Sequence, residues 1–545
     1  MSRLLWILLF TPLLALAQTV IDSPADYEPR LADAYSRLDP KKDGWQTEAA
    51  GDRYAKILKK SVAAFLSDQK PSVLAPEKLR PALKVTFQDD TITVWRRGEG
   101  SAAPPLTWNL LKPKIKVTKI RPDRCEALVT FKNKTTQITT TWDCQFSAEK
   151  LSKVDVLDYE EVRVEKPLFE DITAAAMASV DYYQSQLLRS TDHWRTHFPR
   201  EFGLDAAANH GLALGDVNSD GLDDLYLCQQ GGLPNRLLMH QVDGTLRDHT
   251  AASRTGLLDY CAAAIFADLD NDGDQDLVVS QDFKIVFYDN LDGNGTFEAA
   301  FGHSTNAQSF SLALADYDRD GFLDVFICGY NPSAAKARAG ALGEPIPFHD
   351  ANNGGPNMLW RNKGDWTFED ATQKAGLNDN NTRFSFAAAW ADYDQDGDQD
   401  LYVANDFGRN NLYRNDNGVF HDVADELQVE DTSAGMSVVW GDPNRDGQLD
   451  FYVSNMFSSA GNRITFQNQF LTDADQKVRG SYQRMARGNS LFLGKKDGFS
   501  DATLASHTAM ARWCWGSRWT DFNNDGWQDL LCANGFITAE DPGDL

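Results

Sequence analysis

The feature that most constrains the fold of this chain is an acidic nine-residue segment that occurs six times. Its clearest copy, at residues 392–400, reads Asp-Tyr-Asp-Gln-Asp-Gly-Asp-Gln-Asp. Five carboxylates in nine residues repel one another unless a cation lies among them. Side-chain oxygens at positions 1, 3, 5 and 9, a backbone carbonyl at position 7 and glycine at position 6 have the spacing of a loop that wraps Ca²⁺. The segment therefore predicts a calcium loop.

The six copies recur along the chain and share this ligand spacing. They begin at residues 216, 268, 316, 392, 442 and 521, so the intervals are 52, 48, 76, 50 and 79 residues. Self-similarity at a recurring period indicates a repeat architecture. We expect about one Ca²⁺ per loop as the cofactor. The expected ligands, with position 7 binding through its carbonyl, are Asp216, Asn218, Asp220, Leu222, Asp224, Asp268, Asp270, Asp272, Asp274, Asp276, Asp316, Asp318, Asp320, Phe322, Asp324, Asp392, Asp394, Asp396, Asp398, Asp400, Asp442, Asn444, Asp446, Gln448, Asp450, Asp521, Asn523, Asp525, Trp527 and Asp529.

An EF-hand begins with the same pattern, but it needs a bidentate Glu at position 12 and a helix on either side. None of the residues at position 12 here can supply a carboxylate: they are Leu227, Val279, Ile327, Val403, Val453 and Cys532. The ligand set therefore closes at position 9, and the chain leaves the loop as a β-strand. The strand before each loop is rich in small residues, as at 387–389. Small side chains suit the crowded inner strands of a propeller, so we predict an all-β propeller with six visible repeats and up to seven blades.

The formal net charge of -26 is concentrated in the loops. The six loops hold 24 Asp against two basic residues, Arg319 and Arg445, which leaves a net charge of -22 there. Most of the acidity therefore belongs to the expected metal sites. No basic stripe offsets it, which argues against a nucleic-acid partner.

The N-terminus predicts export. Arg3 precedes a mostly apolar run at residues 4–14, and Ala15-Leu16-Ala17 is a small-x-small cleavage site. We expect cleavage after Ala17. The apolar run is too short to span a membrane, and no other stretch approaches about 20 apolar residues. The expected location is secreted, periplasmic or on the cell surface.

Four further segments follow the signal peptide at residues 1–17. Residues 18–44 are predicted to be a linker. An amphipathic helix followed by a run of strands predicts a small α+β domain at 45–165, loosely similar to nuclear-transport-factor-like domains. Residues 166–204 are expected to supply a closing strand and a helical insertion, and 205–545 the propeller.

The closing strand is predicted from a Phe-x-Asp-x-Thr pattern. Residues 169–173 share it with residues 368–372 and 499–503, where it reads as the outermost strand of a repeat. An isolated copy ahead of the first repeat fits a ring that the N-terminal piece closes by completing the last blade.

The chain has only seven cysteines, and this number is odd, so the sequence does not indicate a disulfide scaffold. Cys125 and Cys144 should lie opposite each other across a hairpin, where a disulfide and two free thiols are both open. Cys514 and Cys532, on the strands around the last loop, are a weaker candidate pair.

The repeat resembles a known family. Each repeat runs from a strand of small residues through the acidic loop to a second strand, and then through an Asn-x-Leu-Tyr/Trp-Arg-Asn turn to the Phe-x-Asp-x-Thr strand. This order looks like the FG-GAP/VCBS repeat of integrin-α-type propellers. Within these, the chain is similar to exported proteins of the ASPIC/UnbV (cartilage acidic protein-like) group. The resemblance implies a β-propeller, commonly of seven blades, with Ca²⁺ in hairpin loops on one rim and a role in adhesion or extracellular binding.

Three functions stay open at this stage. The first is a non-enzymatic, calcium-stabilised module that binds an extracellular protein or glycan. The second is a polysaccharide-active lyase or hydrolase on a calcium-bearing propeller, although no Gly-x-Ser-x-Gly, His-Glu-x-x-His or Cys-His signature occurs. The third is a structural subunit of an envelope complex that docks through the N-terminal domain.

Overall fold

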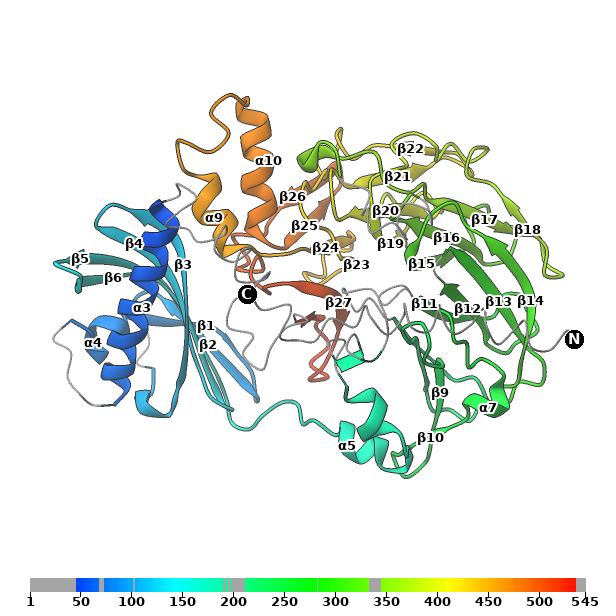
Figure 1. The fold of residues 1–545 in the computed structure, drawn as a ribbon, viewed down its shortest axis with the longest axis horizontal. Coiled ribbons are helices and arrows are strands. Elements are labelled where there is room, and N and C mark those ends of the chain that lie inside the picture. Colours follow the sequence, from blue (N-terminus) through cyan, green and yellow to red (C-terminus); the bar gives the residue numbers. More distant parts are fainter. Residues whose placement is uncertain are drawn as a thin grey trace, which may run out of the picture. The chain divides into compact units, whose positions relative to one another are not determined.

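The computed structural model describes residues 46–67, 73–100, 103–189, 193–194, 197, 211–281, 283–332 and 345–535. The predicted signal peptide and linker lie outside the described residues. The chain divides into two compact units, Met1–Leu168 and Phe169–Leu545 (Figure 1). Within the described residues no helix is both long and apolar enough to cross a membrane.

The first unit is a helix packed on a six-stranded antiparallel sheet. Helix α3 (Gln46–Leu66) places the fully buried Leu58 and Val62 in the core. Alternate residues of the long strands are buried, as the period of two in a half-covered sheet requires. The sheet order is β1-β2-β6-β5-β4-β3. Its elements are α4 (Pro76–Leu79), β1 (Leu83–Gln88), β2 (Ile92–Arg97), η1 (Trp108–Leu110), β3 (Lys112–Arg121), β4 (Arg124–Lys132), β5 (Thr136–Ser147) and β6 (Lys150–Val164).

The buried carboxylate of Glu161, on β6, binds side chains of the sheet and of the segment that precedes it. Glu161 has no exposed side-chain surface and accepts hydrogen bonds from Arg80 at 2.8 and 2.9 Å, from Arg163 at 2.7 Å and from the Tyr159 hydroxyl at 2.8 Å. A buried charge is tolerated when it is paired and hydrogen-bonded in this way.

Cys125 and Cys144 are direct partners across β4 and β5, as the hairpin predicted. All seven cysteines are nevertheless free thiols, so the candidate disulfides are not formed in this structure. The hydrogen bond with the Cys125 thiol, together with burial, raises the pKa of Cys144. The Cys144 sulfur therefore remains a protonated thiol inside the core.

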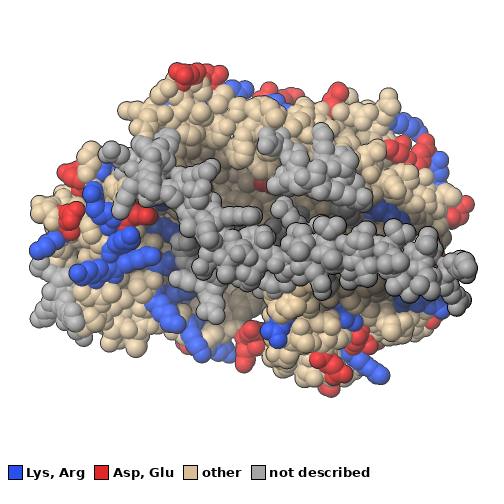
Figure 2. All heavy atoms as spheres, viewed as in Figure 1, with Lys and Arg blue, Asp and Glu red and all other residues tan. Residues whose placement is uncertain are grey.

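The surface of the first unit is basic, unlike the chain as a whole. Residues 46–168 contain 22 Lys and Arg against 16 Asp and Glu. Figure 2 shows blue side chains gathered over this unit. Four of the lysines lie on β3, which is an edge strand of the sheet. Lysines on an edge oppose pairing with strands of other chains.

The second unit is a β-propeller, described as blades A to F. Blades A to E are four-stranded antiparallel sheets, and blade F is described by two strands. Each blade follows chain order from the inner strand outward, and the inner strands of successive blades pack against one another. The strands are β7 (Leu212–Gly215), β8 (Asp224–Leu227), β9 (Arg236–His240) and β10 (Leu246–Asp248) in A; β11 (Cys261–Ala267), β12 (Asp276–Gln281), β13 (Lys284–Asn290) and β14 (Phe297–Ser304) in B; β15 (Ser309–Ala315), β16 (Asp324–Gly329), β17 (Met358–Asn362) and β18 (Phe368–Asp370) in C; β19 (Ser385–Ala391), β20 (Asp400–Asn405), β21 (Asn411–Asn415) and β22 (Phe420–Asp422) in D; β23 (Ser437–Gly441), β24 (Asp450–Ser454), β25 (Ser490–Lys495) and β26 (Gly498–Asp501) in E; and β27 (Cys514–Thr520) and β28 (Asp529–Asn534) in F.

Aromatic rings of the inner strands fill the spaces between blades. Trp390 of blade D lies 6.2 Å from Phe326 of blade C, and Trp519 of blade F lies 6.4 Å from Tyr452 of blade E, measured between ring centroids. Small residues make the close approach possible, since a Cβ at Gly441 would come within 2.8 Å of the Trp519 ring. Trp390 and Trp519, each two positions before the loop of its blade, therefore belong to the inter-blade core.

The segment predicted to close the ring is not a strand in this structure. Residues 166–172 have no ladder partner, because the described part of blade F contains no third strand to pair with. Phe169 instead packs edge-on against Phe522, with ring centroids 5.2 Å apart. Three short helical elements follow: α5 (Thr173–Ala176), η2 (Met177–Ser179) and the π-helical η3 (Tyr183–Leu187). Apolar side chains of η2 and η3 cluster with Leu238 of blade A.

Four further helical elements lie between described strands of the propeller. A short helix, α7 (Thr250–Ser253), follows β10. The insertion in blade C contains η5 (Phe348–Asp350), and the insertion in blade E contains α9 (Ser459–Thr465) and α10 (Gln476–Arg487). Side chains of Ser458 and Asp475 cap α9 and α10 by accepting backbone N–H groups.

Candidate metal centres

Each acidic loop connects the inner strand of a blade to its second strand and has the same backbone. Position 6 is a glycine with φ between 82° and 99° in all six loops. Position 4 is also left-handed, with φ between 56° and 62°, although no glycine stands there. Glycine adopts positive φ without strain, whereas other residues do so rarely. The loop conformation is therefore specific and repeated.

The carboxylates organise the loop through its own backbone. In the blade D loop, Asp392 accepts the N–H groups of Asp396 and Gly397, each at 3.0 Å. The Asp396 carboxylate in turn accepts the N–H of Asp398 at 2.9 Å. In all six loops the glycine N–H reaches the position 1 carboxylate at 2.7–3.1 Å. These bonds hold the first and fifth carboxylates on the inside of the turn.

Position 9 anchors the loop to the rest of its blade. Asp400 has no exposed surface; its Oδ2 accepts the N–H of Tyr393 at 3.1 Å, and its Oδ1 accepts the N–H of Asn415 on the third strand at 2.8 Å. The same pair of bonds forms at Asp224, Asp276 and Asp324. Burial is the main cause that raises the pKa of Asp276, Asp324 and Asp400 to about 7.

Blade E departs from this pattern for a covalent reason. Position 2 of its loop is Pro443, which has no N–H to donate. Asp450 Oδ2 is consequently buried without a hydrogen bond. An orphaned buried carboxylate oxygen is costly unless a cation or another donor satisfies it, so this oxygen is available to a metal.

The donor set fits a hard divalent cation. Carboxylate oxygens converge to within 4.8 Å of one another in three loops. Buried oxygens without a hydrogen bond occur at Asp268 and Asp318 among others. The other three loops have Asn at position 3, so they offer one carboxylate fewer. Oxygen-only ligands with a flexible count suit Ca²⁺. The three convergent groups are Asp268, Asp270 and Asp276; Asp316, Asp318 and Asp320; and Asp392, Asp394 and Asp400.

Neighbouring loops also contact each other through position 4. The left-handed backbone there directs its side chain toward the loop of the next blade. The contacts are Asn271 Nδ2 to the Gly321 carbonyl at 2.9 Å, Arg319 to Asp398 at 2.9 Å, Gln395 Nε2 to the Gly447 carbonyl at 2.7 Å, and Arg445 over the Trp527 ring at 4.1 Å. The loops of blades B to F thus form one connected rim.

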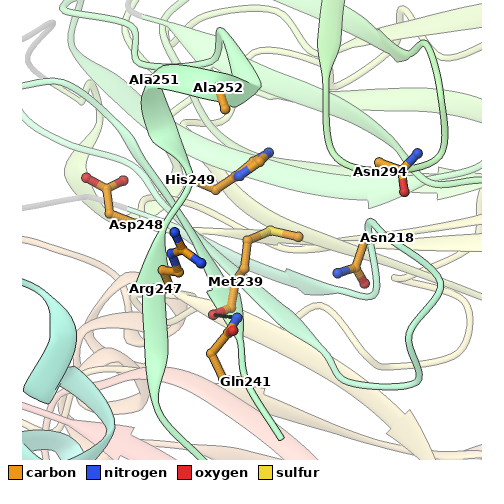
Figure 3. Close-up of a pocket in the computed structure, with 9 residues that line it drawn as sticks. All are labelled: Asn218, Met239, Gln241, Arg247, Asp248, His249, Ala251, Ala252 and Asn294. Carbon is orange, nitrogen blue, oxygen red and sulfur yellow. Dashed lines mark hydrogen bonds between the residues drawn. The ribbon is translucent and has the colours of Figure 1, made fainter.

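A cavity of about 580 Å³ opens beside the blade A loop (Figure 3). Asn218, at position 3 of that loop, and Met239, from the third strand, both line it. The Nε2 atom of His249 is buried without a hydrogen bond in the same wall. The remaining lining residues are Gln241, Arg247, Asp248, Ala251, Ala252 and Asn294.

The opposite rim carries a continuous set of aromatic side chains, which we call the rim aromatics. Seven of them lie where inner strands begin or where second strands end, so the topology places these at the edge away from the metal loops. The other two, Phe348 and Tyr482, lie in η5 and α10 of the insertions. Successive ring centroids are 4.9–6.4 Å apart. In order of contact they are Tyr482, Phe348, Phe407, Phe384, Tyr330, Phe310, Phe386, Trp515 and Trp513.

Charged groups accompany the rim aromatics. The Tyr330 hydroxyl donates to Asp406 at 2.6 Å, and burial raises the pKa of Asp406 to about 6. Asp350 accepts hydrogen bonds from Arg383 at 2.6 Å and from Arg409 at 3.0 Å. The rim therefore combines ring faces with fixed polar groups.

Sequence reasoning located every loop but not the rim aromatics. The nine aromatic residues come from three blades and two insertions, and no local spacing connects them. The motifs along the chain indicate the loops, whereas the set of rim aromatics exists only after the blades are assembled. The one available hint was the position of the two long insertions, which break the repeat period.

The comparisons with known proteins agree with the repeat. The model of the FG-GAP-like repeat matches residues 216–279, 268–327, 350–403 and 392–453. The chain carries FG-GAP-like repeats. These matches include the loops of blades A to E. No curated protein matches the sequence.

Solved structures with a similar course of the chain include three rhamnogalacturonan lyases. The PL11 lyase of Bacillus licheniformis has a TM-score of 0.31 and 9% identity over 84% of this chain and 74% of its own. The exotype lyase YesX has a TM-score of 0.31 and 9% identity over 78% of this chain and 67% of its own. The lyase YesW has a TM-score of 0.30 and 10% identity over 84% of this chain and 73% of its own. At these TM-scores the likeness says nothing about function.

Proposed function

We propose that the protein is an exported, calcium-stabilised β-propeller that binds an extracellular glycan, without catalysis, through the rim aromatics. The observation that carries the proposal is the aromatic set itself, which joins blades C, D and F to the insertions of blades C and E. Phe348 is 46% exposed, and Phe386, Tyr482 and Trp515 are half-buried, so several ring faces are accessible.

Aromatic faces suit sugar rings for an electrostatic reason. The face of an aromatic ring is negative, and the C–H groups on one side of a pyranose carry partial positive charge. Nearby polar groups such as Asp406 and Arg409 can bind hydroxyl groups and fix orientation. A protein ligand is the other occupant of an aromatic rim, and it would be an outcome of the test.

Calcium has a structural role in this proposal. One loop supplies ligands at positions 1, 3, 5, 7 and 9, so little of the coordination sphere remains for a substrate. Binding to the folded loops but not to the unfolded chain stabilises the fold by mass action. We expect a chelator to lower the melting temperature by many degrees, and a thermal scan that a chelator leaves unchanged would contradict the metal assignment.

Glycan binding is tested by retention of the full chain on a panel of extracellular polysaccharides. Trp515→Ala and Tyr482→Ala should weaken retention while the calcium-dependent melting temperature stays near that of the wild type. Phe301→Ala, which removes a ring on the outer strands of blade B, is the matched control. Equal retention of all three variants would contradict the assignment of the rim.

The second candidate is a polysaccharide-active lyase or hydrolase. The pair of Tyr330 and Asp406 favours it, because a phenol and a carboxyl group that titrates near pH 6 are groups that transfer protons. Product formation on the same polysaccharides, abolished by Asp406→Asn, would establish the enzyme over the binding module.

Export and the finer family assignment are part of the proposal. The support is the apolar run and the Ala-x-Ala site at residues 15–17, with the ASPIC/UnbV-like motif order. Mass spectrometry of the secreted protein should find Gln18 at the mature N-terminus. A mature chain that retains residues 1–17 would contradict cleavage.

A further inference from the structure

In blades A to E, one position on the third strand lies next to the position 9 carboxylate of the metal loop, and we call it the facing position. It is the residue before the one whose N–H donates to the position 9 carboxylate. In blade A this residue is Met239, which lines one cavity together with Asn218 at position 3 of the loop (Figure 3). The facing residues of blades A to E are Met239, Asp289, Arg361, Arg414 and Leu493.

In blade C the facing residue enters the loop. Arg361 Nε lies 2.5 Å from Asp318 Oδ2, and its Nη2 lies 2.8 Å from Asp320 Oδ2. Asp318 and Asp320 stand at positions 3 and 5, so they are two of the expected calcium ligands. All three side chains are mostly buried, at 27%, 20% and 25% exposure. An Arg paired with two carboxylates in such a site is held firmly.

The other blades show that this arrangement is particular to blade C. Arg414 occupies the facing position of blade D but pairs with Asp416, at 3.0 and 3.1 Å, in the turn that follows its strand. Met239 and Leu493 carry no charge. Asp289 places a carboxylate at the facing position of blade B, directly before Asn290, whose N–H donates to Asp276.

We infer that Arg361 is the built-in cation of the blade C loop and competes with Ca²⁺ for Asp318 and Asp320. The inference rests on the proposed calcium binding. An ion that enters this loop must displace the guanidinium or bind beside a like charge, and both weaken binding. The blade C loop therefore binds Ca²⁺ most weakly of the loops in blades A to E. Blade B, with Asp289 as an additional carboxylate, binds it most tightly.

The test counts the bound ions in the full chain by equilibrium dialysis and measures their affinities by calorimetric titration with Ca²⁺ alone. Arg361→Leu places in blade C the residue type that blade E already has. It should bind its weakest ion about tenfold more tightly than the wild type, or bind one ion more at about 0.1 mM free Ca²⁺. Arg414→Leu is the matched control and should leave the ion count and the weakest affinity unchanged.

A second readout separates this competition from a general loss of structure. In chelator, Arg361→Leu should melt below both the wild type and Arg414→Leu, because the loop has lost its cation, and added Ca²⁺ should remove that difference. Arg361→Gln, which keeps a polar side chain, should show the same gain in affinity and serves where the Leu variant does not fold.

The outcomes are distinct. Wild-type protein that binds no Ca²⁺ refutes the proposed function and the inference with it. If the wild-type protein binds Ca²⁺ but both Arg361 variants show the same ion count and the same weakest affinity as the wild type, the inference alone is refuted. Asp289→Asn should weaken the tightest ion, and an unchanged tightest affinity would refute the assignment of blade B.

Discussion

Replacing the position 9 carboxylate should destabilise a blade even when no metal is bound. Asp400 is completely buried and accepts two backbone N–H groups, from Tyr393 at 3.1 Å and from Asn415 at 2.8 Å. In Asp400→Ala both donors lose their acceptor inside the protein. Each buried unpaired group costs about 1–3 kcal/mol, so the expected loss is about 2–6 kcal/mol. That is a large part of the about 5–15 kcal/mol that stabilises a typical domain.

The matched control is Asp396→Ala in the same loop. Asp396 is exposed and accepts one N–H, from Asp398, that water can satisfy after the substitution. Its expected loss in chelator is below about 1 kcal/mol. In calcium both variants lose one ligand of one loop, so each should weaken only part of the thermal response to Ca²⁺.

The assay is denaturant unfolding of the full chain in excess chelator, followed by tryptophan fluorescence. Trp390 and Trp440 lie between blades near this loop and report on the propeller. If Asp400→Ala and Asp396→Ala lose equal stability in chelator, position 9 does not anchor the loop, and its buried hydrogen bonds do not account for the blade.

Three other outcomes follow from the contacts described. Burial raises the pKa of the position 9 carboxylates of blades B, C and D to about 7, above the ordinary 3.8. Protonation of these carboxylates therefore stabilises the metal-free fold at low pH, and this contribution disappears as the pH rises through about 7. The melting temperature in chelator should therefore fall from about pH 5 to about pH 8, by more than it does in calcium, and a rise would contradict the burial argument. Glu161→Ala should cost about 3–5 kcal/mol because it leaves Arg80 without its buried partner. Glu160→Ala, in the more exposed pair with Arg96, should cost about 0–1 kcal/mol, and equal losses in denaturant unfolding would show that burial is not the cause. Phe169→Ala should lower propeller stability by about 0.5–1.5 kcal/mol through the lost contact with Phe522, and a thermal scan without any shift would mean that this segment does not support the last blade.

Local spacing determined the repeat. The glycine at position 6, the oxygen ligands around it and the apolar residue at position 12 specify a loop that enters and leaves through strands, because each constraint acts within nine to twelve residues. The loops of blades A to F lie where these motifs predicted them, each between an inner and a second strand. The inter-blade packing of Trp390 and Trp519 also follows from one recurring position.

Tertiary structure alone decided which side chains far apart in the chain meet. Arg361 lies more than 40 residues from Asp318, and only the pairing of β16 with β17 brings it into the loop, while Arg414 at the same position turns to Asp416. The rim aromatics meet because separate blades begin at one edge. Residues 166–172 carry the motif of an outer strand but pair with nothing described, since a strand needs a neighbour to supply its hydrogen bonds. Short segments of sequence determine the local geometry of the loops, whereas charge pairing and shared surfaces depend on how the segments are assembled.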